Sequence, residues 1–242
     1  MANIVLPTQF DCEKIGFDDM KINNNGGKVV YMKYGDTQRV TMQTPKITAP
    51  FGLSEYRDDK TGSVKYSIDV SFKGMESDSK IQTFFDKMKA LDEAVINTAI
   101  DNSKEWFGKK MKREVIEELY RPVVKPAKDP EKYAPTMKFK LQSNNQDELM
   151  VEAFDSDKNK INIIDTFKPG SKLRGIVECS SIWFVNKQFG VTWRALQVEV
   201  TKSDKISGFS FVPEDDEYDT PEIENEYPVE ETQEDEDDDE GL

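Results

Sequence analysis

Apolar and polar residues alternate strictly along Val64–Phe72, and this pattern predicts a strand with one buried face and one solvated face. Two earlier segments, Lys28–Tyr34 and Arg39–Thr44, are rich in β-branched and aromatic residues. The Gly35-Asp36 pair between them has the composition of a tight turn, so the two segments are expected to form a hairpin. Asp58–Gly62 also has turn composition, and it leads into the alternating strand.

The apolar spacing becomes helical in residues 78–101, which predicts a long amphipathic helix with Ser77 or Ser79 as its N-cap. The apolar stripe consists of Ile81, Phe84, Phe85, Met88, Leu91, Val95 and Ala99. A short second helix is expected over Arg113–Tyr120, because Pro122 disfavours helix immediately before it. The prolines that follow predict an extended connector over residues 121–135.

Strand patterns return after this connector. They are Met137, Phe139 and Leu141 in alternation, Leu149–Phe154 paired with Ile161–Ile164, and the long strands Leu173–Val185 and Gly190–Val200 joined at Asn186–Phe189. The expected fold is therefore mainly β with an α insertion (α+β). An OB-fold β-barrel with a helical insertion at about 77–121 fits this order of elements. Periodicity alone leaves a β-sandwich open.

The composition excludes several kinds of catalytic site. The chain has 242 residues and no histidine, so a Ser-His-Asp triad, a Cys-His pair and a His-containing zinc site are impossible. Cys12 and Cys179 are the only thiols, too few for a metal cluster. Residues 1–20 lack the basic start and apolar stretch of a signal peptide, and no apolar run approaches a membrane span. We expect an intracellular protein, not secreted, that is not an enzyme and needs no cofactor.

The net charge of −14 divides into two unlike parts. Glu214–Leu242 contains 17 acidic residues and no Lys or Arg, which leaves 33 basic against 30 acidic residues in positions 1–213. Residues 1–213 are expected to form the folded domain, and 214–242 a disordered acidic tail. Such a tail either keeps the protein soluble or competes, as a tethered polyanion, for a basic groove on the domain.

Asp155-x-Asp157-x-Asn159 resembles the start of a calcium loop, but Lys160 and Thr166 occupy the positions that need Gly and Glu. A hairpin turn is the better interpretation, and no metal site is expected. The more informative pattern is aromatic residues interleaved with cations, as in Lys104–Arg113. Proteins that hold single strands need cations along the phosphates and rings on which the bases stack.

Each ring has to be weighed between a purely structural role and a surface role. Trp106 and Phe107 could close a core at the end of the long helix. Trp193 shares its expected strand face with Gln197 and Glu199, which predicts a wetter position and a surface role. The cations of residues 109–113 oppose the dipole of the second helix, a cost that a nearby anionic partner would relieve.

Three segments carry a resemblance to a known family: Met42–Lys46 (MQTPK) running to Phe51–Leu53 (FGL), Lys65–Phe72 (KYSIDVSF) and Ser181–Trp193 (SIWFVNKQFGVTW). Over residues 28–200, and in its acidic tail, the chain resembles the single-stranded DNA-binding proteins of nucleocytoplasmic large DNA viruses, which are related to the podophage single-stranded DNA-binding protein. The resemblance implies an OB fold that binds single-stranded DNA and an acidic tail that tempers this binding and contacts replication proteins. It implies no catalytic residue.

These observations lead to a hypothesis of sequence-independent single-stranded DNA binding in viral DNA replication, recombination and repair, at a nuclear or cytoplasmic replication site. The expected phosphate contacts are Arg39, Lys46, Arg57, Lys109, Lys110, Lys112, Arg113, Lys187 and Arg194. Bases are expected to stack on some of Phe51, Tyr56, Trp106, Trp183, Phe189 and Trp193.

The expected partners besides DNA are a polymerase, helicase or primase, met through tail residues, and a second copy of the chain in a possible homodimer. The tail residues are Tyr218, Tyr227, Asp237, Asp238, Asp239 and Glu240. Two alternatives stay open: an acidic-tailed scaffold or chaperone for basic proteins that does not bind DNA, and a carboxylate-dependent metal nuclease. The nuclease ranks last, because no pair of carboxylates stands out from the solvated background.

Overall fold

A computed structural model describes residues 4–23, 26–37, 39–57, 59, 62–144, 148–201 and 211–212. The chain divides into two units, Met1–Asp204 and Lys205–Leu242. In the second unit only Phe211 and Val212 are described, and both are exposed. The expected turn at Asp58–Gly62 lies in part outside the described residues.

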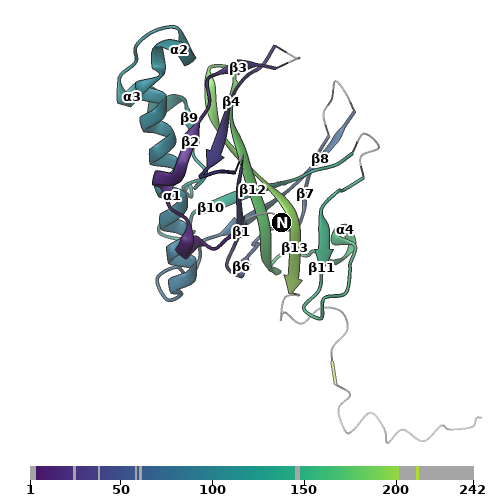
Figure 1. Cartoon of the computed structure of the whole chain (residues 1–242). Helices are drawn as coiled ribbons and strands as arrows, with labels where there is room; N and C mark the ends of the chain where they lie inside the picture. The colour runs from purple at the N-terminus through teal and green to yellow at the C-terminus, as the bar shows by residue number, and fades with distance from the viewer. Residues whose placement is uncertain are drawn as a thin grey trace, which may run out of the picture. The chain divides into compact units, whose positions relative to one another are not determined.

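The first unit is mostly β-sheet with a few helices (Figure 1). The strands are β1 (Ile4–Val5), β2 (Ile15–Phe17), β3 (Lys21–Ile22), β4 (Lys28–Tyr34), β5 (Val40–Gln43), β6 (Ile47–Thr48), β7 (Ser54–Arg57), β8 (Val64–Ser71), β9 (Tyr120–Arg121), β10 (Thr136–Leu141), β11 (Glu152–Phe154), β12 (Lys172–Val185) and β13 (Gln188–Thr201). The helices are η1 (Pro7–Gln9), η2 (Cys12–Lys14), α1 (Ser79–Asp101), α2 (Ser103–Phe107), α3 (Arg113–Leu119) and α4 (Ile163–Thr166).

The long antiparallel hairpin of β12 and β13 organises the sheet (Figure 1). Its loop has two residues, Asn186 and Lys187, with φ of 50° and 67°. Positive φ at both positions is typical of the type I′ turn, whose twist matches that of the flanking strands. The two strands expected at Leu173–Val185 and Gly190–Val200 are confirmed, each slightly longer than expected.

Five strands form a closed circuit of pairings. β12 pairs with β6, β6 with β8, β8 with β10, β10 with β13, and β13 returns to β12. All of these pairs are antiparallel except β10 with β13, which is parallel. The alternation expected in Val64–Phe72 is confirmed, because Ile68, Val70 and Phe72 are fully buried.

The hairpin expected between Lys28–Tyr34 and Arg39–Thr44 is wrong, although strands occur in both segments. β4 and β5 both pair with β12: β4 with Ser181–Trp183 and β5 with Ile176–Cys179. The chain does turn after Tyr34, but one long strand offers enough edge for the two short strands to lie one after the other along it. Strand composition does not reveal this sharing.

Helix α1 covers one side of the sheet (Figure 1). Its stripe packs on the strands through Phe72, whose ring centroid lies 5.6 Å from that of Phe84 and 5.2 Å from that of Phe85. Its N-cap is Asp78, whose carboxylate accepts hydrogen bonds from the backbone N–H groups of Lys80 and Ile81, so the serine cap expected from the sequence is wrong. Asp is as good a cap as Ser, and the sequence does not choose between neighbouring candidates.

The pairing expected between Leu149–Phe154 and Ile161–Ile164 is only partly present. Phe154 bridges to Lys160, but residues from Ile163 onward form α4, and β11 pairs in parallel with β13. The carboxylate of Asp155 accepts from the backbone N–H groups of Asp157 and Asn159, so the calcium-loop-like segment is a turn.

A β-bulge in β13 corrects the expected position of Trp193. Ile176 pairs with Gln197 and Val177 pairs with Ala195, so Leu196 is an extra residue that resets the alternation. Trp193 therefore lies on the inner face, where it is 2 % exposed, and not on the wetter face. No helix of the described residues has the length and apolar character needed to cross a membrane.

Candidate nucleic-acid interface

A row of polar side chains crosses the outer face of the sheet. The register pairs Ser67 of β8 with Lys140 of β10, Lys140 with Arg194 of β13, and Arg194 with Glu178 of β12. Glu178 in turn pairs with Thr41 of β5. Directly paired residues share one face of a sheet. These five residues, called the cross-strand row below, therefore form a continuous track across five strands.

Glu178 is the anchor of this row. It is only 4 % exposed, although it lies on the outer face, because two arginines cover it. Nη1 of Arg39 lies 3.2 Å from Oε2 of Glu178, and Nη2 of Arg194 donates to Oε1. One carboxylate thus holds two guanidinium groups and leaves one positive charge in excess.

Two further lysines, Lys65 of β8 and Lys138 of β10, lie close to Lys140 of the row. Lys138 forms an ion pair with Asp69 at 2.9 Å, whereas Lys140 forms no ion pair among the described residues. Burial lowers the pKa of Lys140, and the charges of Lys65 and Lys138 lower it further. A phosphate placed here would relieve this repulsion. Lys140 is absent from the residues predicted to contact phosphates, although its alternation with Met137, Phe139 and Leu141 already indicates the outer face.

An open hollow of about 630 Å³, called the tip hollow below, adjoins the row near the end of the β12–β13 hairpin. Lys140, Arg194 and Trp183 line it together with polar residues of the hairpin. The ring of Trp183 is half-buried and lies against Gly190 of β13, where a Cβ would stand 3.0 Å from its Cζ2 and 2.8 Å from the carbonyl oxygen of Arg121. Glycine at position 190 therefore lets an indole ring lie close to the sheet beside two cations.

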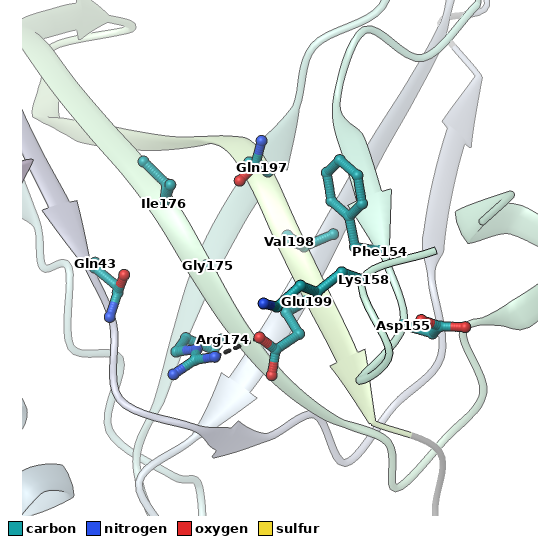
Figure 2. Close-up of a pocket in the computed structure, with 10 residues that line it drawn as sticks. All are labelled: Gln43, Phe154, Asp155, Lys158, Arg174, Gly175, Ile176, Gln197, Val198 and Glu199. Carbon is teal, nitrogen blue, oxygen red and sulfur yellow. Dashed lines mark hydrogen bonds and ion pairs between the residues drawn. The ribbon is translucent and has the colours of Figure 1, made fainter. Parts of the chain in front are cut away.

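The outer face continues away from the tip into a hollow of about 360 Å³ (Figure 2). Figure 2 shows the ion pair of Arg174 with Glu199, and Lys46 lies 3.9 Å from the same carboxylate. Phe154 and Lys158 line the opposite wall. The cations at this end are partly neutralised, in contrast to Lys140.

A third hollow, of about 590 Å³, lies between α2, α3 and the β12–β13 tip, and is called the helix hollow below. Phe107 and Phe184 supply aromatic surface, with ring centroids 5.8 Å apart and planes inclined by 62°. Lys109 and Lys187 line the same hollow, and both are exposed.

The predicted site residues fall into separate groups. Arg39, Trp183 and Arg194 lie on the outer face, as does Tyr56, which pairs with Lys65 across β7 and β8. Lys109 and Lys187 belong to the helix hollow, and Lys46 lies beside Glu199. The remaining exposed members are Phe51, Arg57, Lys110 and Lys112.

Three of the six candidate stacking rings are buried in the core. Trp106, Phe189 and Trp193 are exposed by 3 %, 0 % and 2 %. Trp106 packs edge-on to Phe184 at 5.4 Å, and Phe189 packs on Phe107 at 5.3 Å. A base cannot stack on these rings without opening the core. The structural interpretation therefore holds for Trp106, whereas the surface role expected for Trp193 is wrong.

The charge of Arg113 is already compensated. Its Nη2 donates to Glu93 at 2.6 Å, its Nε to Glu117 at 2.7 Å, and its Nη1 to Asn97. Its hydrogen bond to Glu93 is the main reason that the pKa of that carboxyl is lowered. This network relieves the unfavourable position of Arg113 at the start of α3, without any external anion.

The pKa values of both thiols are raised, which disfavours the reactive thiolate form. Burial raises the pKa of Cys179 to about 12, and burial also raises the pKa of Cys12. No group of three metal-ligating side chains occurs in the described part of the chain. The expected tail contacts lie outside the described residues; they are Tyr218, Tyr227, Asp237, Asp238, Asp239 and Glu240.

Comparison with protein families gives one clear result. Residues 68–218 match the model of a family of unknown function, DUF5871, and the chain belongs to this family. The chain is also 27 % identical over 173 residues to the uncharacterized protein L291 of Acanthamoeba polyphaga mimivirus. That match covers 68 % of this chain but 26 % of the mimivirus protein, so the chain spans about a quarter of its relative's length.

Among solved structures, gp2.5, a single-stranded DNA-binding protein encoded by bacteriophage T7, has a TM-score of 0.44 and 16 % identity, covering 70 % of this chain and 98 % of the phage chain. The single-stranded DNA-binding protein from bacteriophage Enc34 has a TM-score of 0.37 and 14 % identity, covering 84 % and 99 %. The narrower resemblance to proteins of nucleocytoplasmic large DNA viruses stays a prediction.

Proposed function

We propose that this member of the DUF5871 family is a sequence-independent single-stranded DNA-binding protein that holds the strand on the outer face of its sheet. The observation that carries the proposal is the tip hollow, where Trp183, Lys140 and Arg194 converge. A half-buried ring beside Lys140, which forms no ion pair among the described residues, and beside the guanidinium that Glu178 holds in place matches what an unpaired base and its phosphate need. A base inside a duplex could not reach the ring, so single strands are the preferred ligand.

The order of the strands supports an OB-type barrel. In the closed circuit, β6, β8, β10, β12 and β13 follow one another along the chain as five barrel strands, with α1–α3 inserted between the second and the third. OB folds bind oligonucleotides on the face of strands two and three and on the loops that join strands one to two and four to five. In this chain strands two and three are β8 and β10, which carry Lys65, Lys138 and Lys140. The connection between strands one and two carries the exposed rings of Phe51 and Tyr56, and the turn between strands four and five carries Lys187.

The proposed phosphate contacts are therefore revised. Lys140 and Arg194 are central, Arg39 follows along the cross-strand row, and Lys46 and Lys187 extend the track at its two ends. Trp183 is the principal stacking ring, with Tyr56 and Phe51 as further candidates. We no longer propose base stacking on three of the predicted rings, because they are buried in the core: Trp106, Phe189 and Trp193.

The wider role follows from this binding activity. The chain would protect single strands in viral DNA replication, recombination and repair, and its acidic residues 214–242 would regulate access to DNA and contact a polymerase, helicase or primase. Homodimer formation belongs to the same proposal. No catalytic step is assigned.

The direct test is fluorescence anisotropy with a labelled single-stranded oligonucleotide and with the duplex of the same sequence. We expect tighter binding of the single strand, and a loss of affinity in Lys140→Gln that the control Lys128→Gln does not show. Lys128 is exposed on the connector before β10, away from the lining of all three hollows. Absence of binding to either ligand would reject the function and favour a scaffold for basic proteins.

A further inference from the structure

The tip of the β12–β13 hairpin separates two hollows. Trp183 and Phe184 are consecutive residues of β12, and consecutive side chains of a strand point to opposite faces. Trp183 lines the tip hollow and Phe184 lines the helix hollow. Val185, Asn186 and Gln188 line both, so the hairpin tip is the wall between them.

The helix hollow has the chemistry of a nucleotide site. Its floor is aromatic and aliphatic, formed by Phe107 and Phe184 with α2 and α3 beside them. The ring of Phe184 packs nearly parallel to Phe189 at 5.9 Å, which fixes its orientation. Lys109 and Lys187 stand at the rim, and the Nζ of Lys28 donates to the carbonyl of Trp106 at 3.0 Å.

We propose that the helix hollow is a second base-binding subsite for the same DNA strand, which wraps around the hairpin tip. One base stacks on Trp183 in the tip hollow, and a following base enters the helix hollow against Phe184. The phosphates between them pass Lys187, which the two-residue turn presents at the tip. This inference rests on the proposed function and adds the path of the strand to it.

Two features favour DNA over an acidic peptide as the occupant. The helix hollow adjoins the proposed DNA face, because the same residues of the hairpin tip line both hollows. The planes of Phe107 and Phe184 are steeply inclined, so a flat base can stack on one ring while its edge meets the other.

The test compares two exposed apolar residues changed to glutamate. Val115 of α3 lines the helix hollow, whereas Ile164 of α4 lines none of the three hollows, and the two side chains are 41 % and 48 % exposed. Affinities of Val115→Glu and Ile164→Glu are measured by anisotropy for labelled oligothymidylates of about 4 and about 12 nucleotides, which bracket common OB-fold site sizes. A milder pair, Lys109→Gln and its control Lys128→Gln, covers the case in which Val115→Glu fails to fold.

We expect Val115→Glu to weaken binding of the long oligonucleotide about tenfold and to leave the short one unchanged, as loss of one stacked base predicts. Lys109→Gln should weaken only the long one, about threefold. Equal affinities in Val115→Glu and Ile164→Glu would overturn the second subsite, while a loss in Lys140→Gln in the same assay would leave the first site standing. An equal loss on both lengths would also overturn it, since a long-range charge effect would then suffice. Failure of the unmodified chain to bind either oligonucleotide would reject the proposed function itself.

Discussion

The outer sheet face and the helical layer of α1–α3 are both rich in charge, but they differ in how that charge is satisfied. In the helical layer, Arg113 is matched by Glu93 and Glu117, and the buried Asp92 accepts hydrogen bonds from the hydroxyl of Tyr120 and two backbone N–H groups. On the sheet face, Lys140 has a lowered pKa and no carboxylate partner among the described residues. A charged group with an oppositely charged partner stabilises the fold, whereas a surface charge without such a partner is available to bind a ligand.

The largest effect should come from the helical layer. Asp92→Ala removes the acceptor for the Tyr120 hydroxyl and for the N–H groups of Val123 and Val124, all in the interior. Leaving these donors unpaired should lower the free energy of unfolding by about 3 kcal/mol. Urea denaturation measures this change in the free energy of unfolding. The control is Asp86→Ala, at an exposed position of the same helix.

The same variant also probes the comparison. Because Asp92 is buried and lines none of the three hollows, the folded fraction of Asp92→Ala should bind DNA as tightly as the unmodified chain. A loss of affinity in fully folded protein would mean that the interior contacts of Asp92 also support the DNA-binding surface.

Next in size is the loss of one phosphate contact on the sheet face. Lys140→Gln should weaken single-strand binding by about 1 kcal/mol and reduce the slope of log affinity against log salt by about 0.7. Anisotropy titrations across a series of salt concentrations give both values. An unchanged salt slope would remove Lys140 from the phosphate track.

The lowered pKa of Lys140 predicts a dependence on pH. A phosphate favours the charged amine, so the pKa is higher in the complex than in the free protein, and binding takes up a proton. Affinity should therefore fall as the pH rises through the lowered pKa of the free protein. Lys140→Arg should abolish this fall in affinity with rising pH, because a guanidinium stays charged. Identical pH profiles in the two proteins would contradict the assignment.

The smallest effect should come from the compensated arginine. Arg113→Gln should change DNA affinity by less than about 0.5 kcal/mol, because Glu93 and Glu117 already occupy its guanidinium. A loss as large as that of Lys140→Gln would show that the two regions do not differ as described.

Local patterns in the sequence predicted the elements well. The alternation of Val64–Phe72, the stripe of α1 and the long hairpin are all confirmed, because each depends on residues close together in the chain. Which strands pair with each other was not predictable from local patterns. β4 and β5 pair with β12, which lies more than a hundred positions later, and nothing in their own composition specifies that edge.

The candidate site was predicted only in part, for two physical reasons. Trp193 was assigned to the wrong face because a bulge at Leu196 resets the alternation, and an inserted residue leaves no mark in the pattern. The three candidate rings now in the core look the same in sequence as Trp183, since burial depends on what packs above them. Lys140 was missed because its significance depends on neighbours from three other strands.

The most direct test of the account uses the tryptophan fluorescence of the chain. Trp106 and Trp193 are buried, so Trp183 is the tryptophan on which a base can stack directly, and we expect most of the quenching to come from it. We predict that single-stranded DNA quenches the unmodified chain, and that Trp183→Phe loses the quenching but binds within about threefold, because phenylalanine still offers a ring. Trp183→Ala should lose about tenfold or more in affinity. Undiminished quenching in Trp183→Phe would contradict the claim that the strand lies on this face.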